Sequence, residues 1–234
     1  MRNIKAVFTK QILSFFRNPG MFGTPVAFLL FPFVMMLLLA DAEMDLIVAQ
    51  FVVMFVGISM IGTSHGFIAE DRATMNLRFM GMAGVKPYQY LISTCAALLF
   101  ISLIALILFG LIGQHWGASF MSFLLISILG AFCSMLFGIT LSLSKLGPFT
   151  PLFGMLLGIG PMFSEANEVL SNIFHFTYTQ QVSNILRGEE GLTVSLTEPL
   201  QIILINMAVI LFAFVFMNVT NGLDGERIAK KAST

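Results

Sequence analysis

Six long apolar runs, none containing Asp, Glu, Lys or Arg, most constrain how this chain can fold. They cover residues 21–40, 47–69, 88–113, 119–144, 149–164 and 199–219. Crossing about 30 Å of hydrocarbon takes roughly 20 residues of α-helix. The runs show no alternation of period two, so a strand barrel is excluded. We therefore predict an all-α integral membrane protein with six transmembrane helices in a single domain over residues 1–234.

Composition supports a membrane protein. The chain is 57% hydrophobic and only 10% charged, whereas about 25% of residues are charged in soluble domains. A net charge of zero argues against a nucleic-acid partner. The fifth run, 149–164, is short and is interrupted by glycines and Pro161. It is therefore either kinked or only partly spanning.

The charged residues divide by side once the runs are taken as spans. Eleven of the twelve Lys and Arg residues then share one side: Arg2, Lys5, Lys10, Arg17, Arg72, Arg78, Lys86, Lys145, Arg227, Lys230 and Lys231. Only Arg187 lies opposite, together with the acids Asp41, Glu43, Asp45, Glu165, Glu168, Glu189, Glu190 and Glu198. The positive-inside rule places both termini in the cytoplasm of a multi-pass protein. Six spans satisfy the even number that this placement requires.

Residues 2–17 are too charged to span. Their apolar side chains fall on one helical face and most polar ones on the other, which predicts an interfacial helix with its basic groups towards lipid headgroups. The residues that mark this helix are Lys5, Phe8, Lys10, Phe15 and Arg17. The alternative is a plain cytoplasmic extension of the first span. The opposite, outer segment 165–198 contains patterns for one or two short amphipathic helices, ending near Gly188 and Gly191.

Several kinds of site are missing from the sequence. The dipeptide Gly-Lys does not occur, so the usual phosphate-binding loop is absent and we expect no cofactor in this chain. The histidines show no metal-site spacing, and we predict no catalytic residues and no metal. His65 is the one histidine inside an apolar run, and a hydrogen-bonded His is more common there than a proton relay. Gly pairs such as Gly154 with Gly158 indicate close helix packing within the subunit, an interface or a moving joint.

The longest charged loop between spans on the basic side covers residues 70–86. Met75, Phe79 and Met82 recur at i, i+4 and i+7, which predicts a short amphipathic helix at the inner surface that ends at Gly84. Polar residues supply its other faces: Glu70, Asp71, Arg72, Asn76 and Arg78. Alternatively, the loop is a connector that only reverses the chain.

The layout resembles the permease subunits of type-2 ATP-binding cassette (ABC) exporters. Those proteins have an interfacial N-terminal helix, six spans, an outer segment before the last span, and a similar loop between the second and third spans. In that loop the acidic start Glu70-Asp71-Arg72 is followed by Ala73-Thr74-Met75, where the family usually has Gly-Thr-Leu. The matching apolar step is 77–80 and the matching turn is 84–87. The resemblance covers nearly the whole chain by layout and about 20 residues by motif.

This resemblance implies a bacterial plasma membrane, a second permease in a homo- or heterodimer, and a separate nucleotide-binding ATPase subunit that carries ATP and Mg. It implies that the 70–86 loop is a coupling helix docked on that ATPase, through Glu70, Asp71, Arg72, Met75, Arg78, Phe79 and Met82. The uncharged spans favour export of an amphipathic or apolar cargo such as a drug, an antimicrobial peptide or a lipid-linked molecule. Export of polysaccharide or teichoic acid, a non-transporting scaffold or sensor, and a stand-alone secondary carrier are the alternatives. The substrate-binding residues are unknown from the sequence.

Overall fold

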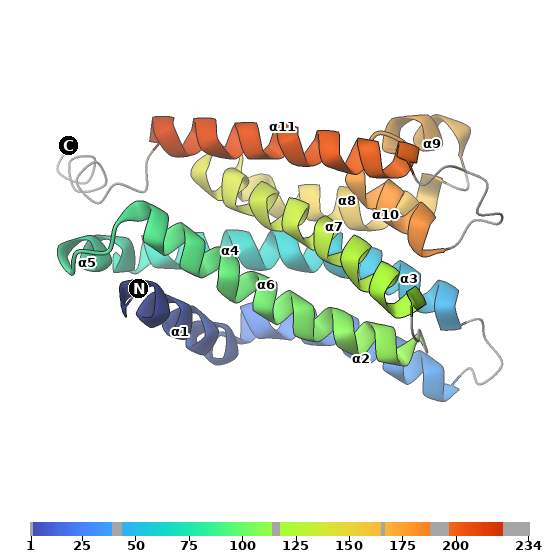
Figure 1. The fold of residues 1–234 in the computed structure, drawn as a ribbon, viewed down its shortest axis with the longest axis horizontal. Coiled ribbons are helices and arrows are strands. Elements are labelled where there is room, and N and C mark those ends of the chain that lie inside the picture. The colour runs from blue at the N-terminus through green and yellow to red at the C-terminus, as the bar shows by residue number, and fades with distance from the viewer. Residues whose placement is uncertain (1, 39–43, 114–117, 165–166, 188–196, 222–234) are drawn as a thin grey trace.

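A computed structural model describes residues 2–38, 44–113, 118–164, 167–187 and 197–221, and the regular structure in these ranges is helical throughout. The first six helical elements are α1 (Arg2–Arg17), α2 (Pro19–Leu38), α3 (Met44–Met54), the π-helix η1 (Phe55–Met60), α4 (Ile61–Ala73) and α5 (Asn76–Met82). They are followed by α6 (Pro87–Ile112), α7 (Ala118–Leu143), the 3₁₀-helix η2 (Gly147–Phe149), α8 (Thr150–Ser164), α9 (Glu168–Phe174), α10 (Tyr178–Leu186) and α11 (Thr197–Asn221). The long helices lie lengthwise beside one another (Figure 1).

Four described helical stretches are long and apolar enough to cross a membrane: Ile47–Ala73, Pro87–Ile112, Phe120–Leu143 and Glu198–Met217. The pair α1 and α2, bent by 73° at its break, makes a fifth if it counts as one span. The predicted all-α, multi-pass class is therefore confirmed. The number six stays a prediction, because the 15 residues of α8 rise only about 22 Å.

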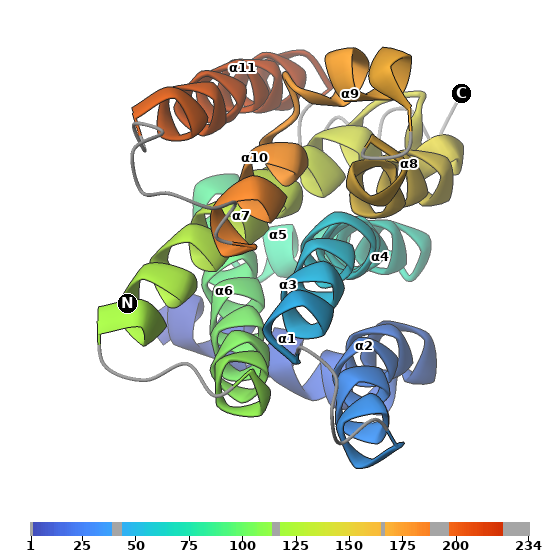
Figure 2. The same ribbon diagram turned by 90° about the vertical axis from the view of Figure 1, so that its right-hand side faces the viewer.

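The second predicted span forms the centre of the bundle. The elements α3, η1 and α4 follow one another without a break, and α4 packs on α7 while η1 packs on α8. Figure 2 shows α3 and α4 between α2 and α8. In the most apolar window of this span 72% of the residues are buried, against 11% in α11. The outer surface of α11 is thus left for lipid.

Close contact between η1 and α8 depends on glycine. A Cβ added at Gly57 would lie 2.4 Å from the Cα atom of Gly158, and one added at Gly158 would lie 2.6 Å from Cγ1 of Ile58. Only hydrogen fits at these two positions, as at other small-residue contacts between membrane helices. The pairing of Gly154 with Gly158 therefore serves packing inside the subunit.

The N-terminal helix packs on protein along its apolar face. Val7 and Phe15 are 4% and 3% exposed, and α1 lies against α6 and α2. Leu13 and Phe16 remain exposed, at 49% and 60%. The predicted amphipathic helix over 2–17 is present, but its apolar face covers the bundle, and only its margin is left for a lipid surface.

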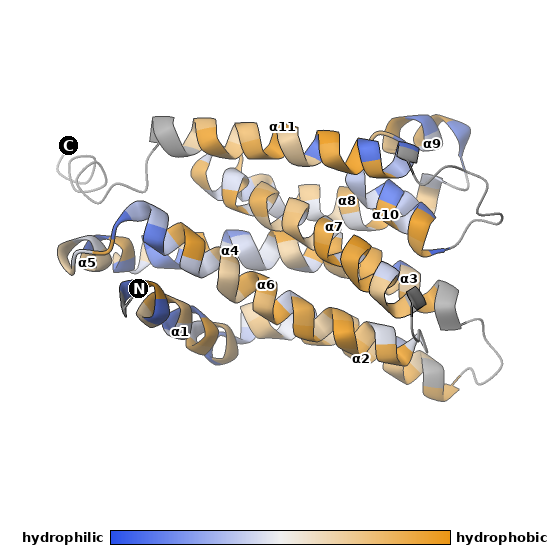
Figure 3. Ribbon diagram, viewed as in Figure 1, coloured by the Kyte–Doolittle hydropathy of each residue, from blue (hydrophilic) through white to orange (hydrophobic). Residues whose placement is uncertain are grey.

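Hydrophilic residues gather at the two ends of the bundle (Figure 3). The end of α4, helix α5 and the beginnings of α1 and α6 lie at one end, and α9 lies at the other (Figure 1). The predicted outer segment contains two short helices, α9 and α10. Parts of the predicted charge pattern lie outside the described residues, namely Asp41, Glu43, Glu165, Glu189, Glu190, Arg227, Lys230 and Lys231, as do Gly188 and Gly191.

Candidate functional site

The loop that follows the central span is divided by a left-handed residue. Helix α4 continues through Glu70, Asp71 and Arg72 to Ala73, and Met75 then adopts φ 59° before α5 begins at Asn76. Met75 has the one positive φ among described non-glycine residues. The short helix predicted within 70–86 therefore covers only Asn76–Met82, while Glu70, Asp71 and Arg72 belong to α4. A left-handed residue such as Met75 cannot continue a right-handed helix, so the two are separate.

Helix α5 ends at Met82, and Gly84 closes it, as the sequence predicts. The Gly84 backbone has φ +78°, and the amide of Val85 donates to the carbonyl of Met80 at 2.9 Å. The amide of Gly84 donates to the carbonyl of Gly81 at 3.0 Å. These two bonds form a Schellman motif, which satisfies the last carbonyls of the helix and turns the chain into α6.

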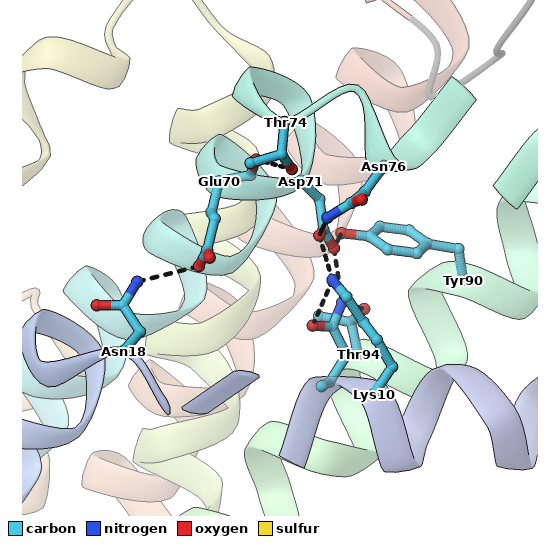
Figure 4. Close-up of polar contacts among 9 residues, drawn as sticks. Lys10, Asn18, Glu70, Asp71, Thr74, Asn76, Tyr90 and Thr94 are labelled. Carbon is cyan, nitrogen blue, oxygen red and sulfur yellow. Dashed lines mark hydrogen bonds and ion pairs between the residues drawn. The ribbon is translucent and has the colours of Figure 1, made fainter. Parts of the chain in front are cut away.

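A buried carboxylate ties this loop to two other helices, α1 and α6. Asp71 is 1% exposed and accepts hydrogen bonds from Gln11 Nε2 at 2.9 Å, Tyr90 Oη at 2.8 Å and Asn76 Nδ2 at 3.2 Å. The ammonium of Lys10 forms an ion pair with the same carboxylate (Figure 4). A buried charge needs such pairing and hydrogen bonding. The junction of α4 and α5 is therefore fixed to α1 and α6.

We call Asp71 and its four donors the Asp71 cluster: Lys10, Gln11, Asn76 and Tyr90. It contradicts two predictions made from the sequence. Asp71 was expected to contact a partner, but its side chain lies inside the protein and its bonds are internal. Lys10 was expected to face lipid headgroups, but its ammonium is directed at Asp71. Both residues hold the loop in place: Asp71 is buried, and Lys10 keeps about a third of its side chain (34%) exposed.

Two further predicted residues make internal bonds at the same end. Glu70 accepts a hydrogen bond from Asn18 Nδ2 at 3.1 Å, which links α4 to the start of α2 (Figure 4). Arg72 donates from Nη1 to the carbonyl of Ser142, near the end of α7, at 2.7 Å. Both side chains are half-buried, so they brace the junction and expose only part of themselves.

The remaining predicted contacts form an exposed surface, which we call the α5 surface: Met75, Arg78, Phe79 and Met82. Met75, Phe79 and Met82 are 45%, 59% and 68% exposed, and Arg78 is exposed as well. Leu77, on the opposite side of α5, is 6% exposed and fixes the helix to the bundle. Three large apolar side chains beside a cation thus lie uncovered on a helix that is held firmly from behind.

The residues predicted to mark the N-terminal helix are split between surface and interior. Lys5 and Arg17 are exposed. Phe15 packs against Phe67 and Phe22, with ring centroids 6.5 and 5.6 Å apart, and Phe8 lies 6.1 Å from Phe100.

Sequence reasoning missed Gln11, Tyr90 and Thr94. Gln11 is fully buried and donates to both Asp71 and Thr94, the latter at 3.1 Å. A signal was available for Gln11 alone, because it falls between Val7 and Phe15 on the helical face that carries the buried residues. Tyr90 and Thr94 belong to the first turns of an apolar run, where no local pattern marks a partner.

This end of the molecule combines a buried polar cluster around Asp71 with an exposed, largely apolar surface on α5. Within the described ranges no group of three or more His, Cys, Asp or Glu residues could hold a metal ion. The chain matches no family model, no curated protein and no solved structure.

Proposed function

We propose that this chain is the membrane-spanning subunit of a type-2 ABC exporter in a bacterial plasma membrane, with six spans and both termini in the cytoplasm. A second permease, identical or different, completes the pathway. A separate nucleotide-binding subunit carries ATP and Mg and supplies the work. The cargo is an amphipathic or apolar molecule that leaves on the side of α9 and α10.

The observation that carries the proposal is the α5 surface. Exposed methionine and phenylalanine side chains beside Arg78 suit a partner with an apolar cleft and acidic rim. The Asp71 cluster joins the base of this surface to α1, α4 and α6. A force on α5 would therefore be passed to the central span α3–η1–α4, because side chains on both sides of the junction are held by buried bonds.

The test is capture and coupling of the ATPase. The chain is purified from its native membranes, the co-purifying nucleotide-binding subunit is identified, and both are reconstituted in vesicles. Phe79→Glu should lower the amount of bound ATPase roughly tenfold or more, because it places a charge at the centre of an apolar contact. Val169→Glu on α9, where Val169 is 66% exposed, is the control and should leave binding unchanged.

Two results would overturn the proposal. A partner that neither binds nor hydrolyses ATP would favour the scaffold or sensor alternative. Cargo movement by the isolated chain along a proton gradient, with no ATPase present, would favour a secondary carrier.

A further inference from the structure

A groove with both polar and apolar walls lies between the start of α2 and the central span. It has a volume of about 380 Å³ and is lined by Asn18, Gly20, Met21, Thr24, Ser59, Gly62, Thr63, Gly66 and Glu70. Pockets for small ligands begin at about 300 Å³. Gly20, Thr24 and Gly62 are exposed while Ser59 and Thr63 are buried, so the groove opens at the molecular surface and reaches into the protein.

The buried part of the groove contains a hydroxyl, that of Ser59, without a hydrogen-bond partner among the described residues. Ser59 is fully buried, and no hydrogen bond to its Oγ atom is present within the described structure. A buried hydroxyl that makes no bond costs about 1–3 kcal/mol. Ser59 belongs to the π-helix η1, and π-helical turns occur frequently at functional sites. An oxygen of a bound molecule would satisfy this donor.

The end of the groove nearest α5 carries a carboxylate, that of Glu70, with no counter-ion among the described residues. The Glu70 carboxylate accepts its hydrogen bond from the neutral amide of Asn18, and the ion pairs among described residues do not include it. The nearby Lys10 ammonium is engaged with Asp71. The carboxylate is therefore available to a cation that enters the groove. Glu70 lies near the end of α4, at the same end of the bundle as α5 (Figure 1).

Helix geometry sets the length of the site. From Ser59 to Glu70 the helix rises about 16 Å, which separates the free hydroxyl from the carboxylate. Between them, Gly62 and Gly66 have no side chains, which leaves space along the floor of the groove. A Cβ added at Gly62 meets nothing within 4 Å. On the facing helix, Pro25 has no N–H to donate to the carbonyl of Met21, so that oxygen lacks its usual helical donor.

We infer that this groove binds an amphipathic cation. Its ammonium group pairs with Glu70, its apolar body lies over Gly62 and Gly66, and a hydrogen-bonding oxygen further along the body accepts from Ser59. As an account of the exported cargo, this inference rests on the proposed function. As a binding site, it holds for the isolated chain with no ATPase present.

The test measures binding to the purified chain in phosphatidylcholine nanodiscs. The probe is 12-aminododecanamide, which carries an ammonium and an amide at opposite ends of eleven methylene groups, and its uncharged derivative acetylated on the amine is the matched ligand. We expect the ammonium probe to bind roughly tenfold or more tightly than the acetylated one, the ratio that a charge-assisted hydrogen bond provides. Glu70→Gln keeps an acceptor for Asn18 and should remove this preference.

Two further variants test the walls of the groove. Gly62→Phe places a ring over the floor of the groove, starting from a Cβ that meets nothing within 4 Å, and should abolish binding of the probe. Gly23→Phe is the control: a Cβ at Gly23 also meets nothing within 4 Å, but Gly23 does not line the groove. Ser59→Ala should weaken binding several-fold while leaving the unliganded melting temperature unchanged or higher, because it removes an unbonded buried hydroxyl.

A second arm of the experiment, with a different lipid composition, distinguishes a lipid headgroup from a cargo as the source of the cation. Nanodiscs that contain phosphatidylethanolamine should block the probe if the site takes an amine headgroup of lipid, and should leave it bound if the site takes a cargo. Equal binding of charged and acetylated probes, or binding that survives both Glu70→Gln and Gly62→Phe, would overturn the inference. This experiment does not depend on capture of the ATPase. A failure of the binding-site inference is therefore distinguishable from a failure of the proposed export function.

Discussion

Asp71 shows how a single residue can change role between sequence and structure. Its place in a charged loop predicts a surface contact, but four donors, from α1, from α6 and from its own loop, surround it. Burial of the carboxylate is tolerable only because those donors replace water. The side chains that are accessible to a partner are those of the α5 surface, which begins one helical turn further along the chain.

Neutralising this carboxylate should loosen the junction. Asp71→Asn keeps the shape of the side chain but leaves the Lys10 ammonium, with about one third of its side chain exposed (34%), without its counter-ion. We expect a loss of about 1–3 kcal/mol, measured as a lower apparent melting temperature in one detergent. Combined with Lys10→Met, the substitution should cost less than the sum of the two single changes. Strict additivity would show that the ion pair contributes nothing.

Gly84 is required for its backbone conformation alone. Its φ of +78° disfavours any Cβ, although space around it is open. Gly84→Ala should therefore cost about 1–2 kcal/mol, and Gly84→Asn less, because Asn tolerates this region better. Both are read by thermal unfolding beside Gly23→Ala, where the Cβ is equally free and the φ is not positive. Equal melting temperatures for Gly84→Ala and wild type would contradict the assignment.

At the scale of elements, the sequence predicted the long helices better than the loop 70–86. The apolar runs 88–113 and 119–144 differ by one residue at each end from α6 and α7, because long apolar runs in lipid have helix as their one satisfied conformation. The loop 70–86 was harder. Helix pattern continues across it, and only the left-handed backbone of Met75 separates α4 from α5. No residue preference announces that turn, since glycine is the usual occupant.

The contact of η1 with α8 gives an element-scale prediction. Gly57→Ala brings a methyl group within 2.4 Å of the Gly158 backbone, so the two helices must separate. Overpacking of this kind costs about 1–3 kcal/mol, and we expect reduced yield of folded protein by size-exclusion chromatography. Gly62→Ala, which meets open space in the neighbouring turn, is the matched control. If both variants behave alike, close approach at Gly57 is not what sets the contact.

At the scale of the whole molecule, α8 decides how many times the chain crosses the membrane. The α1–α2 pair is bent, and α8 is short for a full crossing. A partial crossing of α8 would put its two flanks on the same side of the membrane. Six crossings would put them on opposite sides and leave both termini inside.

Cysteine labelling separates these arrangements. In a background with Cys95 and Cys133 replaced by Ala, single cysteines are placed at Lys86, Lys145 and Glu168. An impermeant thiol reagent applied outside intact cells should label Glu168→Cys only, because α8 lies between Glu168 and Lys145. Label at both Glu168→Cys and Lys145→Cys, or at neither, would show that α8 does not cross.

The sequence by itself determined the class of this protein. Uncharged runs of about 20 residues need lipid as solvent and helix as backbone, and this holds whatever the neighbours are. Only the tertiary structure decided which polar residues face inward. Gln11, Asp71 and Tyr90 meet from three helices, and Ser59 and Glu70 line one groove with α2. Such meetings depend on how helices far apart in the chain pack, and hydrophobic patterning within one helix carries no record of its neighbour's polar groups.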